Sequence, residues 1–129
     1  MDLSIIIAMY NEENFIKECL SSILSQDYKD FEVIIVNDGS TDKSLEVCKK
    51  IIKDNINVTL ITTKNYGQSH ARNIGLKSAK GKFVLFFDAD DYLNKNALNQ
   101  IMNDVINQNA DVNIFSYYYF FNKNPDKKH

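Results

Sequence analysis

The sequence predicts an α/β protein with a doubly wound, mostly parallel sheet flanked by helices. Aliphatic runs that suit strands buried on both faces alternate with segments whose apolar residues recur at helical spacing. This alternation continues along most of the 129 residues, without repeats or low-complexity stretches. It is typical of parallel sheets whose strands are joined by right-handed helical crossovers.

Five strands are expected, each an aliphatic or aromatic run. They cover Leu3–Met9, Phe31–Val36, Val58–Thr62, Phe83–Phe87 and Val112–Phe121. The aromatic run Tyr117–Phe121 is expected to be a buried strand. In a free fragment the same strand would be an exposed edge, through which the chain could self-associate.

Four helices are expected between and after these strands. The first follows Asn11, which we expect to be its N-cap, with Glu12 and Glu13 in the first turn. The others cover about Asp42–Lys53, Gly67–Ala79 with Gly81 as the C′ residue, and a segment marked by Ala97, Ile101, Val105 and Ile106. Cys19 and Cys48 lie on apolar helix faces and are expected in the core.

Composition and charge exclude several classes of protein. The net charge of −2 and the pI near 5.6 argue against a nucleic-acid partner, which requires a basic footprint. The two cysteines lack the C-x-x-C spacing of metal sites, and the N-terminus lacks the basic region of a signal peptide. We therefore expect a cytoplasmic protein, whose full-length form is compatible with a peripheral position on a membrane.

Acidic side chains follow the predicted strands at the edge where an open parallel sheet binds its ligands. The carboxyl ends bring together Ala8–Asn11, Asn37–Asp38, Thr63–Gly67 and Asp88–Asp91. Three carboxylates within the last four residues would repel one another unless a cation offset them. Oxygen ligands of this kind suit Mg²⁺ or Mn²⁺. The alternative is that Asp88 and Asp91 only form turns and cap a helix.

The turn after the first predicted strand and the single arginine limit which ligands this edge can bind. The turn Ala8–Glu13 has no glycine and two acidic side chains, so it does not suit the pyrophosphate of a nicotinamide cofactor. Arg72 is the only arginine, and its planar fork of donors suits either a diphosphate or an aspartate. His70 has no partner at a spacing that indicates a hydrolytic triad.

Four motifs together resemble family 2 glycosyltransferases of the GT-A fold. They are Ser4–Glu12 (SIIIAMYNE), Val36–Asp42 (VNDGSTD), Asn65–Gly75 (NYGQSHARNIG) and Asp88–Asp91 (DADD). Each motif alone is weak, but all four occur in the family's order, each at a strand end or in the following helix. The resemblance covers the chain from Leu3 to about Phe121.

The resemblance implies transfer of a sugar, with inversion, from a nucleotide diphosphate sugar, often a UDP-sugar, to an acceptor hydroxyl. It implies nucleotide-sugar contacts at Ala8, Tyr10, Glu12, Asp38, Asn65, Gly67, Arg72, Asp88 and Ala89. Asp38 and Asn65 would contact the base, and Arg72 would lie toward the phosphates. Asp90, with Asp88, would hold a divalent metal, Mn²⁺ or Mg²⁺, on the diphosphate. The acceptor would be a glycan or a lipid-linked sugar of a cell-surface polysaccharide.

Residues 1–121 are expected to form the donor-binding GT-A domain, and 122–129 a loose tail. The family's general base, an acidic residue after the fifth strand, has no counterpart among the downstream carboxylates Asp104, Asp111 and Asp126. An acceptor hydroxyl must lose its proton during attack. We therefore expect the base beyond residue 129, in a longer enzyme of which this chain is the N-terminal portion.

Two other functions remain open from the sequence. Phe86–Asp90 also resembles the haloacid dehalogenase motif, which would make the protein an aspartate-nucleophile phosphotransferase or phosphatase. That family places its motif after the first strand, whereas here it follows the fourth. A non-catalytic nucleotide-binding or receiver-like module, with Asp38 as phosphoacceptor, is the other alternative.

Overall fold

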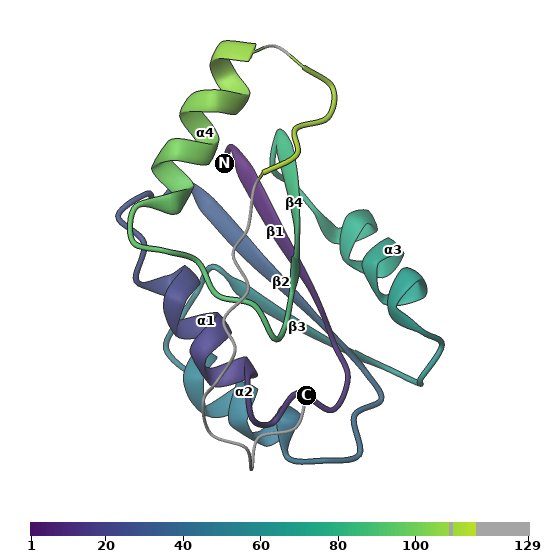
Figure 1. Cartoon of the computed structure of the whole chain (residues 1–129). Coiled ribbons are helices and arrows are strands. Elements are labelled where there is room, and N and C mark those ends of the chain that lie inside the picture. The colour runs from purple at the N-terminus through teal and green to yellow at the C-terminus, as the bar shows by residue number, and fades with distance from the viewer. Residues whose placement is uncertain (109, 116–129) are drawn as a thin grey trace, which may run out of the picture.

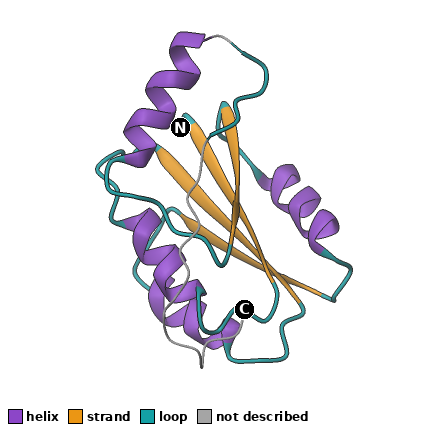
Figure 2. Ribbon diagram, viewed as in Figure 1, coloured by secondary structure: helices purple, strands orange, loops and turns teal. Residues whose placement is uncertain are grey.

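The computed structural model describes residues 1–108 and 110–115. Its elements are β1 (Leu3–Met9), α1 (Ile16–Leu24), β2 (Phe31–Asp38), α2 (Ser44–Ile52), β3 (Val58–Thr63), α3 (Gln68–Ser78), β4 (Phe83–Asp88) and α4 (Ala97–Gln108). The strands form one four-stranded sheet in the order β3-β2-β1-β4, and all three pairings are parallel. Figure 2 shows the alternation of strand and helix that the sequence predicts.

Helices cover both faces of the sheet, as expected for a doubly wound fold (Figure 1). On one face, α1, α2 and α4 pack against alternate residues of the central strands, including Ile5 and Ile7 of β1. On the other face, Ala71 of α3 packs against Ile34 and Val36 of β2. β1 and β2 are buried along almost their whole length, which explains their continuous aliphatic sequence.

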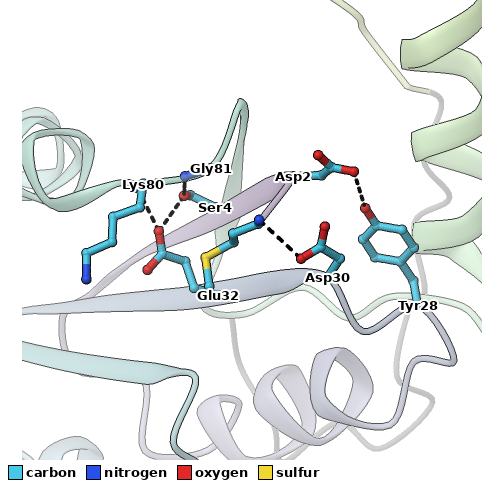
Figure 3. A network of polar contacts seen from close by, with 8 residues as sticks. Asp2, Ser4, Tyr28, Asp30, Glu32, Lys80 and Gly81 are labelled. Carbon is cyan, nitrogen blue, oxygen red and sulfur yellow. Dashed lines mark hydrogen bonds and ion pairs between the residues drawn. The ribbon is translucent and has the colours of Figure 1, made fainter.

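A buried polar network joins the chain at the amino end of the sheet (Figure 3). The Ser4 hydroxyl, which is fully buried, donates to the Glu32 carboxylate at 2.7 Å. The same carboxylate accepts the Lys80 backbone N–H at 2.7 Å, and the Gly81 N–H donates to the Ser4 hydroxyl at 2.8 Å. These bonds join β1, β2 and the turn before β4 at this end of the sheet.

The predicted role of Gly81 as a helix C′ residue is wrong. α3 ends at Ser78, and its C-cap residue Ala79 is extended. A Cβ atom on Gly81 would lie 2.5 Å from the Ser4 backbone nitrogen and 2.6 Å from the Leu3 carbonyl carbon. Glycine is required here because the backbone of the turn runs directly against β1.

The predicted N-cap role of Asn11 is also wrong. α1 begins at Ile16, its N-cap residue is Phe15, and no side chain caps it. Asn11 has a left-handed φ of 54°. Its side-chain oxygen accepts the Thr41 backbone N–H at 2.8 Å, from the loop after β2. Asn11 therefore joins two loops, a tertiary contact that helix-capping rules do not anticipate.

The expected fifth strand is wrong over residues 112–115, which are irregular. Val112 and Ile114 are 77% and 93% exposed. Strand propensity depends on packing against neighbouring strands, and these side chains have no such cover among the described residues. Residues 116–121 of the predicted strand, with its aromatic run, lie outside the described residues, as does the tail 122–129.

The predicted core positions of the two cysteines are confirmed. Cys19 and Cys48 are fully buried and unpaired. Burial raises the pKa of both thiols, and that of Cys48 to about 11. Among the described helices, none combines the length and the apolarity needed to cross a membrane.

Candidate functional site

The strand order reverses at β1, where β2 lies on one side and β4 on the other. The register of these pairings aligns Ala8 of β1 with Val36 of β2 and with Asp88 of β4. Asp38, at the end of β2, aligns with Thr63 at the end of β3. The carboxyl ends therefore meet at one edge, at the reversal of strand order where open α/β sheets bind ligands.

Three carboxylates form a cluster at this edge. Side-chain oxygens of Asp88, Asp90 and Asp91 all lie within 4.8 Å of one another. The turn is closed by the Asp91 N–H, which donates to the Asp88 carbonyl at 3.1 Å. Ala89 is only 3% exposed and belongs to the core, which leaves the acidic residues around it at the surface. The oxygen-only donor set fits a hard divalent ion such as Mg²⁺ or Mn²⁺.

A further carboxylate, that of Glu12 in the loop after β1, is influenced by the charge of the acidic cluster. Burial raises the pKa of Glu12, and so does the negative charge of nearby aspartates, which in decreasing order of effect are Asp90, Asp42 and Asp88. Burial also raises the pKa of Asp91, with further contributions from Asp90 and Asp88. Burial is the first cause of both shifts, and the negative charge of the neighbouring aspartates, which a bound cation would offset, adds to it.

Arg72 lies against this cluster. Its Nη2 is 2.7 Å from Asp88 Oδ1, and the two side chains are 34% and 46% exposed. The guanidinium also lies over the Phe86 ring, 6.0 Å from its centroid. Gln68 Nε2 approaches the same Asp88 oxygen at 3.4 Å. The sequence left two partners open for Arg72, an aspartate and a diphosphate. The structure shows its contact with the aspartate Asp88, and a contact of Arg72 with a diphosphate remains a prediction.

Asp38 holds the turn between β3 and α3. It is only 3% exposed, and its two oxygens accept the backbone N–H groups of Tyr66 at 2.9 Å and Gly67 at 2.8 Å. The Thr63 hydroxyl donates to it at 3.3 Å. Gly67 has a φ of 97°, which permits the sharp entry into α3. Contact between Asp38 and a nucleobase remains a prediction, and this internal role was missed from the sequence.

The loops that follow β2 and β3 are in close contact. A Cβ atom on Gly39, which has a φ of 72°, would lie 2.8 Å from the Asn65 backbone nitrogen. This places Asn65 beside the end of β2, as its predicted contact with the base requires. Tyr66, next to it, is 64% exposed, and its ring meets that of His70 edge-on at 5.0 Å.

Hydrogen bonds between the loops after β1 and β2 form what we call the loop clasp, made by Asn11, Glu12, Glu13 and residues 40–44. The Glu12 N–H donates to the Ser44 hydroxyl at 2.7 Å. The Glu13 N–H donates to the Asp42 carboxylate at 3.1 Å. The Glu13 carboxylate in turn accepts the Lys43 N–H at 2.9 Å. The clasp fixes the backbone beside Tyr10, whose side chain is 43% exposed at the edge.

Sequence reasoning placed Asp91 at this edge among the three carboxylates but predicted only Asp88 and Asp90 as metal ligands, whereas Asp91 lies in the same cluster. It omitted two other contributors to the edge. Gln68 shares the Asp88 oxygen with Arg72, and its position at the start of α3 was the available signal. The loop clasp depends on contacts between residues about 30 positions apart, which no local pattern reveals.

The fold and the site define a Rossmann-like α/β protein of the GT-A class. The family model described as glycosyl transferase family 2 matches residues 4–129, and the chain belongs to that family. It is 37% identical over 118 residues to glycosyltransferase GlyA of Streptococcus pneumoniae. It is 40% identical over 115 residues to the poly(ribitol-phosphate) beta-N-acetylglucosaminyltransferase TarS of Staphylococcus aureus. These matches cover 92% and 87% of the chain.

Solved structures share this fold. The structure of S. aureus TarS 1-349 in complex with UDP-GlcNAc matches 86% of the chain with a TM-score of 0.79 and 37% identity. The mannosyltransferase PcManGT from Pyrobaculum calidifontis, in complex with GDP-Man and Mn²⁺, matches 80% with a TM-score of 0.72 and 30% identity. These matches cover 33% and 31% of the two solved chains.

The chain spans only a part of the curated relatives. It corresponds to 17% of the length of GlyA and 20% of that of TarS. The family of this domain is thus established, whereas the reaction of the whole protein is a matter for proposal.

Proposed function

We propose that this chain is the donor-binding part of an inverting glycosyltransferase that uses a nucleotide diphosphate sugar, with a UDP-sugar as the favoured donor. The observation that carries the proposal is the acidic cluster at the reversal of strand order, with Arg72 bound to Asp88. The UDP-GlcNAc and GDP-Man complexes of the two solved relatives support a nucleotide sugar as ligand.

The donor's diphosphate is assigned to the acidic cluster through a divalent cation. Asp88 and Asp90 would hold the ion, and Asp91 lies within the same 4.8 Å group. When bound, Mn²⁺ or Mg²⁺ would offset the negative charge that develops on the leaving nucleoside diphosphate. The Mn²⁺ in the PcManGT complex supports this choice of metal.

The nucleoside is assigned to the surface beside Ala8 and Tyr10. Asp38 and Asn65 would contact the base, and the buried Asp38 would keep the turn that carries Asn65 in place. Arg72 would exchange part of its contact with Asp88 for the phosphates. Arginine suits this exchange because it offers several N–H donors in one plane.

The acceptor and the general base are assigned to the rest of a longer enzyme. We place the donor-binding domain at residues 1–121 and the base beyond residue 129. The acceptor would be a hydroxyl of a glycan or a lipid-linked sugar in cell-surface polysaccharide synthesis. The relative TarS is named as a transferase acting on poly(ribitol-phosphate). On this assignment the 129-residue chain binds donor and transfers no sugar by itself.

The two alternative functions find less support. Both oxygens of Asp38 already accept backbone N–H groups, which is unfavourable for a phosphoacceptor. Asp88, the nucleophile of the phosphotransferase alternative, is ion-paired with Arg72. Membership in glycosyl transferase family 2 favours neither alternative.

The experiment is calorimetric titration of the chain with UDP, GDP and CDP, each with and without Mn²⁺. We expect UDP to bind best, only with the metal, and Asp90→Ala to abolish that binding. Asp104→Ala, at an exposed position on α4, is the matched control and should bind as wild type does. Equal binding of UDP without metal would refute the role of Asp90, and trapping of an acyl phosphate would favour the phosphotransferase.

A further inference from the structure

Three side chains form a row on one side of α1 and the turn after it. Cys19 and Ser22 are three residues apart on the helix, and Gln26 follows four residues later. We call these residues the α1 row. Cys19 is fully buried, and Gln26 is only 3% exposed. Such spacing places side chains on one face of a helix, so the row presents polar groups in a line.

The α1 row contacts the segment that carries the acidic cluster. In Figure 1 this segment leaves β4, passes α1 and continues to α4. The Ser22 hydroxyl accepts the Leu93 backbone N–H at 2.9 Å. Gln26 Nε2 donates to the Asn94 carbonyl at 2.8 Å, and Gln26 Oε1 accepts the Leu98 N–H at 3.2 Å. Two side chains of α1 and its following turn thus hold the backbone at 93, 94 and 98.

The beginning of the segment is fixed as well. Asp88 pairs with Ala8 in the sheet, and its carbonyl lies 3.7 Å from the Cys19 Sγ. Only four residues, 89–92, therefore separate the fixed end of β4 from the Leu93 anchor. Asp90 and Asp91 lie within this short span, so the anchor at Leu93 limits where their carboxylates can point.

From these contacts we infer that Ser22 and Gln26 are positioning residues for the divalent cation. They act by holding the backbone of the acidic segment, without touching the ion, and this inference rests on the proposed function. A cation site requires its carboxylates at fixed separations, and groups that orient metal ligands typically affect metal affinity by about 10-fold or more. Loss of the Leu93 anchor would release Asp90 and Asp91 from their shared geometry with Asp88.

A purely structural role for the same residues makes a different prediction. Gln26 also accepts the Leu98 N–H near the start of α4, and its loss would lower the stability of the fold. Lower stability alone leaves metal affinity unchanged at temperatures where the chain is folded. Metal affinity measured far below the unfolding transition therefore separates positioning from stability.

The test uses Ser22→Ala and Gln26→Met in the 129-residue chain. Ser22→Thr is the rescue variant because it retains a hydroxyl. Ser25→Ala is the matched control, since Ser25 is exposed at the end of the same helix and its hydroxyl donates to the Ser22 carbonyl, within α1, at 3.4 Å. The readouts are Mn²⁺ affinity by electron paramagnetic resonance at saturating UDP, and hydrogen exchange of the Leu93 and Leu98 amides in the metal-free chain.

We expect Ser22→Ala and Gln26→Met to bind Mn²⁺ about 10-fold more weakly and to exchange the anchored amides faster. Ser22→Thr and Ser25→Ala should match wild type in both readouts. Unchanged Mn²⁺ affinity with faster exchange would overturn the inference and leave the proposed function standing. Absence of UDP-dependent Mn²⁺ binding by wild type would refute the proposed function, and the inference with it. If Gln26→Met does not fold, the Mn²⁺ affinities and amide exchange of Ser22→Ala and Ser22→Thr test the inference.

Discussion

The Arg72 guanidinium lies 2.7 Å from the Asp88 carboxylate and so joins α3 to the acidic cluster at the end of β4. Gln68, one turn earlier on α3, reaches the same oxygen. These contacts bring a cation beside a group of three carboxylates that would otherwise repel one another. The same guanidinium is open enough, at 34% side-chain exposure, to meet an incoming phosphate.

Replacement of this arginine tests the need for its planar fork. We expect Arg72→Lys to weaken UDP binding about 10-fold, because lysine cannot contact a carboxylate and a phosphate with the same geometry. Folding stability should change by less than about 1 kcal/mol, since the ion pair is partly exposed. Calorimetry and urea unfolding measure the two effects, with Lys77→Arg on the same helix as control. Wild-type affinity in Arg72→Lys would contradict a phosphate contact.

Asp38 is expected to stabilise the fold as well as the site. Asp38→Ala would remove the acceptor of two part-buried hydrogen bonds, from the Tyr66 and Gly67 N–H groups, at a cost of about 1 kcal/mol each. Urea unfolding should show the loss, with Asp54→Ala, an exposed residue, as control. A change below about 0.5 kcal/mol, the range of ordinary surface substitutions, would show that these hydrogen bonds do not hold the turn.

The charge of Glu12 gives the stability a dependence on pH. Its pKa is raised in the folded chain, first by burial and then by the neighbouring aspartates. Between the ordinary pKa and the raised one, the folded chain binds more protons than the unfolded chain, so the free energy of unfolding falls as pH rises. We expect Glu12→Gln to lack this contribution. Relative to wild type, the variant should become more stable as pH rises from the ordinary pKa of a glutamate through the raised pKa of Glu12.

Urea unfolding of the metal-free chain across this range measures the effect, and the exposed Glu18→Gln is the control. Mn²⁺ should reduce the difference between Glu12→Gln and wild type, because a cation offsets the same repulsion. A pH-independent difference between the two would show that the pKa of Glu12 is not raised in the folded chain.

Gly81 offers a test of the fold at the opposite end of the sheet. Gly81→Ala should destabilise the chain by about 1–3 kcal/mol, because its Cβ would overlap the backbone of Ser4 and Leu3. Thermal or urea unfolding measures the loss, and Lys82→Ala, at the exposed neighbouring position, serves for comparison. Equal stability of Gly81→Ala and wild type would mean that the turn can move away from β1.

Local sequence patterns predicted the elements that bury one continuous apolar face. β1 and β2 are nearly uninterrupted aliphatic runs, and α3 was predicted within one residue at each end. Errors arose where a residue's partner is distant in sequence. Asn11 bonds to Thr41 and Gly81 to Ser4, so capping rules assigned both to the wrong role. The strand expected from Val112 failed because propensity does not supply a neighbouring strand.

The candidate site was predicted to the extent that the carboxyl ends of parallel strands must share one edge. That rule placed Ala8, Asp38 and Asp88 together, and the register confirms their common edge. It could not reveal that Asp38 accepts two backbone N–H groups, since that depends on how the β3–α3 turn folds back. The same rule placed Asp91 at this edge, and the turn around the buried Ala89 brings its carboxylate within 4.8 Å of those of Asp88 and Asp90.

The most direct measurement of the central claim is the position of the metal in crystals grown with UDP and Mn²⁺, located by anomalous scattering at the manganese edge. A peak bonded to carboxylate oxygens of Asp88 and Asp90, and to the diphosphate of UDP, is the predicted result. A UDP molecule bound with no manganese peak at these carboxylates, or a peak at another part of the chain, would contradict the claim.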